Sequence, residues 1–147
     1  MIQIEDRILV RTPLRQTFRF AARPENMPRW NQTVLESTLK GPLRRGAVVE
    51  QRIDLLGHRF DAVFEVTCYH PFRKVTYASI RGPVDLEGTM QFQPAPSGTL
   101  IQWVVYGDCR RFLRVAEPIL VSLGRKGMHD CLEKLRCLSE EARGALT

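Results

Sequence analysis

Six stretches of strand-like sequence follow one another between residues 33 and 108, and only short turns separate them. The strand candidates are 33–40, 47–56, 59–69, 73–81, 84–93 and 99–107. The separators carry residues that turns prefer, and they are Gly41-Pro42, Gly57-His58, His70-Pro71, Gly82-Pro83 and 94–98. Connections this short cannot carry a parallel crossover, so each strand must pair antiparallel with the next. The chain is therefore predicted to form an antiparallel meander.

The side chains of these strands alternate between the two faces of the predicted sheet. In 59–69 the even-numbered positions are apolar or small, whereas most odd-numbered positions are charged or polar. The stretches 84–93 and 99–107 alternate in the same way. Such alternation is typical of a sheet with one buried face and one wet face. The orientation of 73–81 stays open, because apolar side chains occur on both of its faces.

The N-terminal segment predicts one more strand and two short helices. Residues 2–11 place Ile2, Ile4, Ile8 and Val10 on one parity, as a strand with one buried face does. A Thr-Pro pair follows, which suits the start of a helix, and the apolar spacing then predicts a short amphipathic helix over 13–22. Pro24 is expected to open a second short helix, which Pro28 is expected to end just before Trp30.

The remainder of the chain, 109–143, reads as one long helix. Its predicted apolar or small stripe consists of Phe112, Ala116, Ile119, Leu120, Leu123, Gly127, Cys131, Leu135 and Leu138. Pro118 is expected to distort or delay the first turns of this helix.

A strongly twisted sheet of seven strands curves, and one helix across its concave face cannot fill the hollow along its full length. Aromatic and methionine side chains are therefore expected to line a cavity. Gly127 lies near the centre of the helix stripe, with Gly124 one turn earlier, although glycine inside a helix costs about 1 kcal/mol relative to alanine. Either the missing side chain leaves room for a ligand, or it permits close helix–sheet packing or a kink.

Three segments of the sequence resemble a known superfamily. They are TPLRQTFRFAARPENMPRW (12–30) after a strand, DLEGTMQFQP (85–94), and GTLIQW (98–103) ahead of a long helix. In this order they resemble the SRPBCC superfamily, which includes START-like domains and the polyketide cyclase/dehydrase group. The resemblance covers essentially the whole chain.

The resemblance implies an α+β, helix-grip (START-like) fold that occupies residues 1–147 as a single domain. This fold has a seven-stranded curved antiparallel sheet, two short helices and a long C-terminal helix. Members of the superfamily bind lipids, sterols, polyketides or quinones, and some catalyse cyclisation or dehydration. Function must still be argued from the site, because one fold hosts many activities.

Ten residues are candidates for ligand binding in the predicted cavity. They are Trp30, Gln51, Phe64, Tyr77, Ser79, Arg81, Met90, Trp103, Leu123 and Gly127. Trp30 either closes the mouth of the cavity or plugs the core. Gln51 has inward parity on an apolar face, so its amide must find a partner, either a ligand or an internal neighbour. The aromatic and methionine side chains either contact a ligand or simply pack in the hydrophobic core, as such residues more often do.

Charge, the lack of long apolar runs and cysteine content argue against several classes of function. The net charge is +6 and arginine outnumbers lysine 18 to 4, but the arginines are scattered, so a nucleic-acid partner is not favoured. No apolar run is long enough to cross a bilayer, and the N-terminus lacks the pattern of a signal peptide, so a cytoplasmic location is expected. The four cysteines form no CxxC pair, and neither a metal nor a cofactor is expected.

Three hypotheses for function remain open. The first is a non-catalytic protein that binds a small hydrophobic or amphipathic ligand, such as a lipid, polyketide or quinone-like molecule. The second is a polyketide cyclase or dehydratase that acts in the same cavity, which requires a positioned acid or base; Tyr77, Ser79 and Arg81 are its candidates. The third is an interaction module, for example a homodimer through the outer face of the sheet.

Overall fold

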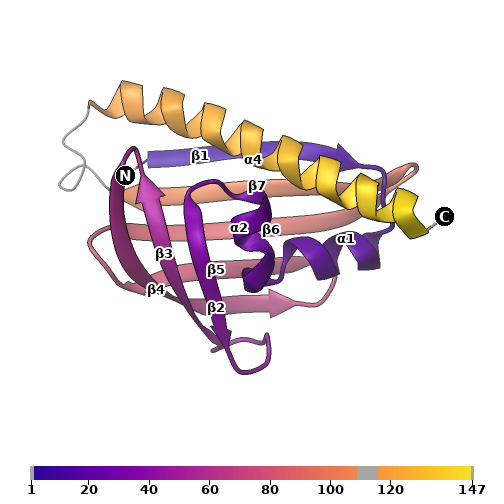
Figure 1. The fold of residues 1–147 in the computed structure, drawn as a ribbon, viewed down its shortest axis with the longest axis horizontal. Helices are drawn as coiled ribbons and strands as arrows, with labels where there is room; N and C mark the ends of the chain where they lie inside the picture. The colour runs from indigo at the N-terminus through magenta and orange to yellow at the C-terminus, as the bar shows by residue number, and fades with distance from the viewer. Residues whose placement is uncertain (1, 109–115, 147) are drawn as a thin grey trace.

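A computed structural model of the chain describes residues 2–108 and 116–146 (Figure 1). The elements, in chain order, are β1 (Ile2–Val10), α1 (Leu14–Ala21), the 3-10 helix η1 (Pro24–Asn26), α2 (Met27–Trp30), β2 (Val34–Lys40), β3 (Val48–Leu55), β4 (His58–His70), β5 (Lys74–Arg81), β6 (Asp85–Ala95), β7 (Gly98–Asp108) and α4 (Glu117–Leu146). A curved seven-stranded sheet faces one long C-terminal helix, so the predicted helix-grip architecture is confirmed.

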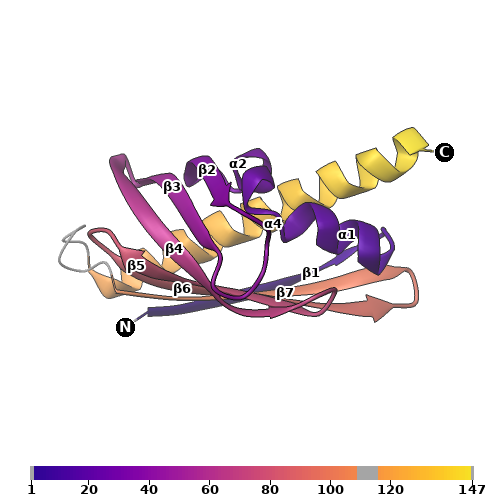
Figure 2. The same ribbon diagram turned by 90° about the horizontal axis from the view of Figure 1, so that it is seen from below.

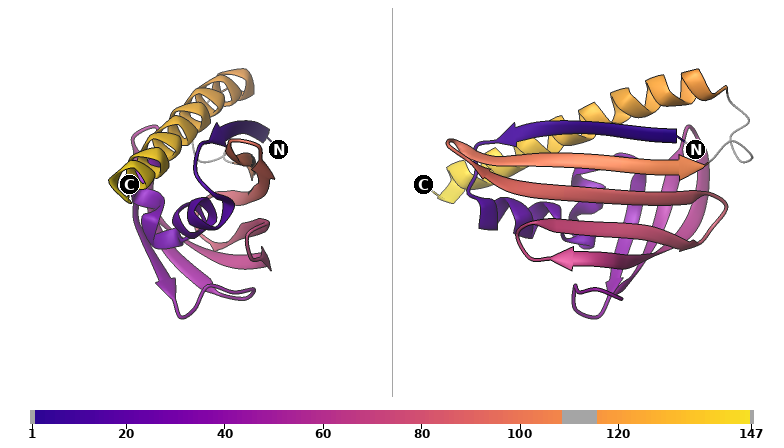
Figure 3. Two further views of the ribbon diagram at one scale, coloured as in Figure 1. Left: turned by 90° about the vertical axis from the view of Figure 1, so that its right-hand side faces the viewer. Right: turned by 180° about the vertical axis from the view of Figure 1, so that it is seen from behind.

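The sheet has the strand order β1-β7-β6-β5-β4-β3-β2, and every neighbouring pair is antiparallel. Six strands form the expected meander from β2 to β7. The first strand then pairs with the last one along its full length, from Ile2 opposite Gly107 to Val10 opposite Thr99 (Figure 3). The two sheet edges are therefore β1 and β2.

Irregular pairing bends one half of the sheet away from the other. The register of β4 against β5 shifts between Val63 and Phe64 and again between Val66 and Cys68. An extra residue in one strand of a pair bends that strand and increases its twist. Figure 2 shows β2, β3 and β4 rising out of the layer formed by β1, β6 and β7, with α4 crossing the hollow side.

The inward face of the sheet is the one that alternation predicted. Ala62, Phe64 and Val66 of β4 are buried, and so are Met90 and Phe92 of β6. The open orientation of β5 is also settled: Val75 and Tyr77 lie in the core, whereas Ile80 is exposed.

Buried contacts fix the start of α1 to the sheet. The carbonyl oxygen of Thr12 accepts hydrogen bonds from Thr17 Oγ1 at 3.1 Å and from Thr99 Oγ1 at 2.7 Å. The ring of Phe18 packs edge-on against Phe92, with 5.0 Å between the ring centroids. These contacts anchor the helical segment between β1 and β2 to the sheet.

The prediction that Pro28 ends the second short helix is wrong. The segment is a 3-10 turn, η1, that continues directly into α2, and Pro28 lies in the first turn of α2. Proline is tolerated there because the first amide groups of a helix have no intrahelical acceptor. The helix therefore runs on to Trp30.

The long helix α4 begins at Glu117, so Pro118 is its second residue. The predicted earlier start at 109, with Phe112, falls on 109–115, outside the described residues. The predicted stripe is wrong in its early turns: Ile119 is 53% exposed and Leu123 is 44% exposed. Leu120, Cys131 and Leu135 of the predicted stripe are buried, and Met128 and Leu132, which were not part of it, are buried with them. The reason is that α4 packs mainly along the edge strand β1, and this contact determines which side of the helix is buried.

None of the described helices is long and apolar enough to span a membrane.

Candidate functional site

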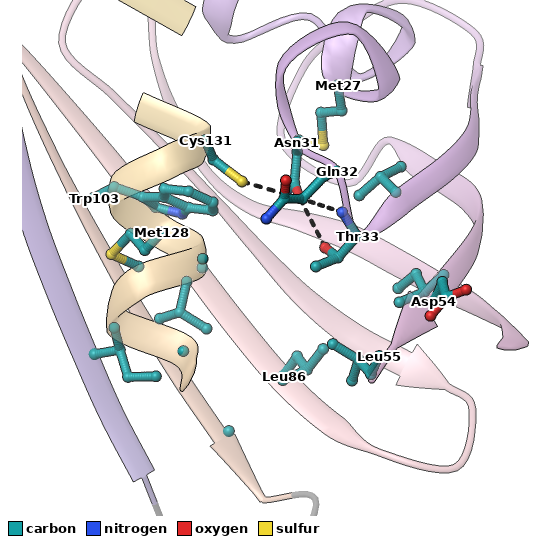
Figure 4. Close-up of a pocket in the computed structure, with 18 of the residues that line it drawn as sticks. Met27, Asn31, Gln32, Thr33, Asp54, Leu55, Leu86, Trp103, Met128 and Cys131 are labelled. Atoms are coloured by element: carbon teal, nitrogen blue, oxygen red, sulfur yellow. Dashed lines mark hydrogen bonds between the residues drawn. The ribbon is translucent and has the colours of Figure 1, made fainter. Parts of the chain in front are cut away.

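A cavity of about 470 Å³ lies between the concave face of the sheet and α4 (Figure 4). Its volume falls in the range of about 300–1,000 Å³ that small-molecule sites occupy. Its wall combines residues of β1, α2, β3, β4, β5, β6, β7 and α4. Eight of the ten predicted site residues line it: Trp30, Gln51, Phe64, Tyr77, Met90, Trp103, Leu123 and Gly127. Ligand binding by these residues stays a prediction.

The two glycines of α4 have different roles in forming this space. A Cβ atom on Gly127 would meet no heavy atom within 4 Å, so this position faces open space. A Cβ atom on Gly124 would overlap Cδ1 of Ile4 on β1. Gly124 therefore permits close approach of helix and sheet, whereas Gly127 leaves room in the cavity. Each of the two interpretations open from the sequence holds for one of the glycines.

Two tryptophans form the inner end of the cavity. Trp30 of α2 is only 2% exposed, and its ring packs edge-to-face on Trp103 of β7, with 5.4 Å between the centroids and 77° between the planes. Trp30 is thus a core residue that forms part of the wall, and it does not close the mouth. Its indole Nε1 is buried and has no hydrogen-bond partner among the described residues.

The opening of the cavity lies beside the turn between β3 and β4. The exposed residues of the lining are Gln32, Leu56, Gly57 and Leu123. Leu56 and Gly57 form a two-residue turn in which both φ angles are positive, 52° and 87°. This is the backbone geometry of tight hairpins, and it holds the 52%-exposed Leu56 side chain at the rim.

A polar cluster joins the end of α2 to α4 (Figure 4). Asn31 Oδ1 accepts hydrogen bonds from the Thr33 amide at 3.0 Å, from Thr33 Oγ1 at 2.7 Å and from the Cys131 thiol at 3.6 Å. Burial raises the pKa of the Cys131 thiol, which keeps it protonated and able to donate. Cys131 belongs to the apolar stripe predicted for the long helix, whereas Asn31 was not among the predicted site residues. The available signal was its position directly after Trp30, where the chain leaves a helix and enters a strand.

Gln51 and Tyr77 are buried in the wall and have internal partners. Gln51 donates from Nε2 to Ser37 Oγ at 3.0 Å. The Tyr77 hydroxyl donates to the carbonyl oxygen of Ala22 at 2.7 Å, which ties the sheet to the end of α1. Burial raises the pKa of Tyr77 above its usual value, because the phenolate would be desolvated. Tyr77 is therefore a neutral structural donor and is not set up as an acid or a base.

Ser79 and Arg81 lie outside the cavity lining, although they share the parity of Tyr77. The pairing of β5 with β6 ends at Ala78, and beyond that point the Leu86 amide donates to Ser79 Oγ at 2.9 Å. Arg81 is exposed beside the turn that follows β5. Here β5 stays paired with β4 alone, and the register of that pairing shifts between Ser79 and Arg81, so the parity of Tyr77 does not carry these two side chains into the cavity.

The cavity lining carries almost no charged side chains. Among the described residues, no lysine, arginine or histidine lines it. Its one carboxylate, Asp54, is near the opening, where Arg59 Nε lies 3.2 Å from Asp54 Oδ2. The site can therefore hold an apolar body and make neutral hydrogen bonds, but its lining offers no counter-charge to an anion.

Comparison with solved structures supports the same fold. Protein TTHA0849 from Thermus thermophilus has a TM-score of 0.79 at 15% identity, over 96% of this chain and 99% of that one. A START superfamily protein from Mycobacterium smegmatis has a TM-score of 0.78 at 14% identity, over 95% and 98%. The di-domain ARO/CYC StfQ from the steffimycin biosynthetic pathway has a TM-score of 0.75 at 13% identity, and this chain covers 52% of it. At these identities the likeness shows the fold alone.

Sequence comparison identifies the family. No curated protein sequence matches the chain. Residues 1–140 match the family described as "Polyketide cyclase / dehydrase and lipid transport". This match and the START-like neighbours confirm the resemblance carried by residues 12–30, 85–94 and 98–103. The chain belongs to the polyketide cyclase / dehydrase and lipid transport family.

Proposed function

We propose that the protein binds a small hydrophobic or amphipathic molecule in the cavity between its sheet and α4. The observation that carries this proposal is the cavity of about 470 Å³ with an almost wholly uncharged lining. Its wall includes Phe64, Met90 and the Trp30–Trp103 pair, and Gly127 leaves space where the helix faces the sheet. Burying an apolar ligand there gains about 25 cal/mol for each Å² removed from water.

Two measurements test the proposal. Solvent extraction of the purified protein, followed by mass spectrometry, is expected to release a bound apolar compound. Independently, the neutral dye Nile red is expected to bind the emptied protein with enhanced fluorescence. The variant Gly127→Leu fills open space and should weaken dye binding at least several-fold, because a Cβ at this position points into the cavity.

Lys126→Leu is the matched control, since it adds the same side chain at the neighbouring, exposed position of α4. It should leave dye binding unchanged. If Nile red does not bind, or if both variants weaken it equally, the cavity is not the binding site and the proposal fails.

The alternative is a cyclase or dehydratase that acts in the same cavity. Such an enzyme needs an acid or base positioned inside the cavity. The three residues that the sequence suggested are not assembled there: Tyr77 donates to Ala22, and Ser79 and Arg81 lie outside the lining. The described lining therefore favours binding over catalysis. Release of a ligand together with a product that has lost water would support the enzyme instead.

A further inference from the structure

The hydrogen bonds of Asn31 fix the orientation of its side-chain amide. The backbone N–H of Thr33 can only donate, so the atom that it meets at 3.0 Å must be Oδ1. The Thr33 hydroxyl and the Cys131 thiol bond the same oxygen. The NH₂ group is therefore on the other side, and no described residue accepts a hydrogen bond from it. Asn31 is only 8% exposed and lines the cavity, so this donor belongs to the cavity wall.

Trp103 supplies a second donor in the same wall. Its indole Nε1 has no acceptor among the described residues. A Cβ atom on Gly88 of β6 would lie 3.7 Å from this nitrogen. Because Gly88 has no side chain and itself lines the cavity, the approach to the indole N–H stays uncovered.

The two residues that carry these donors are close to one another in the cavity wall. Trp30 packs edge-to-face on Trp103, and Asn31 is the next residue after Trp30 in the chain. Figure 4 shows Trp103 and Asn31 on either side of the Cys131 sulfur. Both N–H groups belong to cavity-lining residues and have no acceptor among the described residues, so this part of the wall is complementary to an oxygen atom of a ligand.

The charge of that oxygen is restricted by the rest of the lining. No lysine, arginine or histidine among the described residues faces the cavity, and the only carboxylate is Asp54 near the opening. A carboxylate or phosphate moved into this site would lose its hydration and gain no counter-ion. A neutral carbonyl oxygen loses much less hydration free energy on burial, and two N–H donors can replace the hydrogen bonds that it made with water.

We infer that the cavity selects a neutral ligand whose apolar body carries a carbonyl-type acceptor oxygen, which hydrogen-bonds to Asn31 Nδ2 and Trp103 Nε1. This inference rests on the proposed function and narrows its ligand class, since ionised fatty acids and phospholipid headgroups are excluded from the inner end. Asn31 and Trp103 then determine specificity, whereas the aliphatic and aromatic side chains supply the affinity.

The test uses methyl nonyl ketone with a ¹³C-labelled carbonyl, and undecane as its hydrocarbon counterpart, both displacing Nile red. Binding to the wild-type protein should lower the infrared stretching frequency of the carbonyl below its value in dry hydrocarbon solvent. Trp103→Phe removes the indole N–H, and Asn31→Leu, which is close to asparagine in size, removes the NH₂ group and places no other donor there. Each variant should raise the stretching frequency and weaken the ketone about 3–10-fold more than it weakens undecane. Tyr106→Phe, an exposed hydroxyl deletion on the same strand as Trp103, is the control and should change neither value.

A second arm tests the charge. Undecanoic acid should bind in its neutral form and lose about tenfold in affinity for each pH unit above the pKa of its carboxyl group. The inference is overturned if the bound ketone keeps the stretching frequency of dry solvent, if the variants weaken ketone and undecane equally, or if ionised undecanoate binds as well as the acid. In these cases Nile red still binds and the proposed function survives. If neither the dye nor the ketone nor undecane binds the wild-type protein, both the inference and the proposed function are refuted.

Discussion

Replacement of the two glycines of α4 by alanine tests whether the hollow beneath the helix is real. Alanine is favoured over glycine inside a helix by about 1 kcal/mol, and this gain applies to both positions. A Cβ on Gly127 meets nothing within 4 Å, so Gly127→Ala should keep the whole gain. The free energy of unfolding should rise by about 1 kcal/mol, which raises Tm by about 2–4 °C for a chain of this size.

Gly124→Ala is the matched comparison, since it makes the same change one turn earlier. Its Cβ would overlap Cδ1 of Ile4, so the isoleucine must change rotamer or β1 must shift. Overpacking of this kind costs about 1–3 kcal/mol. This cost cancels or exceeds the gain in helix propensity, so Gly124→Ala should be about 1–3 kcal/mol less stable than Gly127→Ala.

Equilibrium unfolding in urea, followed by far-UV circular dichroism, measures the difference directly. The slope of the free energy against urea concentration should stay equal for the three proteins, so that the midpoints report stability alone. A Gly127→Ala protein that is less stable than the wild type would mean that atoms fill the space beneath residue 127. The cavity, and with it the proposed function, would then be wrong.

Three further predictions concern the wall and the rim of the cavity. Tyr77→Phe should lower the free energy of unfolding by about 1–3 kcal/mol, because the Ala22 carbonyl loses its buried donor. Because burial raises the pKa of Tyr77, the stabilisation by its neutral hydroxyl is complete below about pH 10 and is lost as the pH rises further. Urea unfolding at alkaline pH should therefore show a larger loss of stability for the wild type than for this variant. Peptide-resolved thiol labelling should modify exposed Cys137 quickly and buried Cys131 slowly, and a cavity ligand should slow Cys131 further; equal rates would show that the Cys131 side of the cavity is open to solvent. Leu56→Asn should raise thermal stability by about 1 kcal/mol, because asparagine adopts a positive φ of 52° more readily than leucine; a lower Tm would mean that the exposed leucine makes a stabilising contact.

Most of the sheet was predictable from the sequence because its strands and turns are determined by residues close together in the chain. Alternation along β4, β6 and β7 reports burial residue by residue, and short turns between strands leave only antiparallel pairing. The parity of a residue stops predicting which face its side chain occupies where the pairing of the strand becomes irregular. Ser79 was assigned to the cavity from the parity of Tyr77, but β5 leaves β6 after Ala78, and no property of the side chains signals that divergence.

The helix and the polar cluster were harder to predict for a different reason. The buried face of α4 depends on which strand the helix packs along, so the apolar spacing did not show that Leu123, although it lines the cavity, is 44% exposed. The hydrogen bond from Cys131 to Asn31 joins residues one hundred positions apart. Their pairing is a property of the assembled fold, and the sequence indicates at most that a buried asparagine must have a partner.

The antiparallel ladder between β1 and β7 has a consequence for how the protein folds on the ribosome. Ile2 lies opposite Gly107, so β1 must wait for β7 to leave the exit tunnel before the two strands can pair. Until then β1 has no partner strand and its aliphatic side chains are not packed. The long loop that must close between β1 and β7 also slows formation of the native register. We therefore expect nascent chains truncated before residue 98 to remain sensitive to protease and to bind chaperones, and the cavity to form only after β7 and α4 have been synthesised.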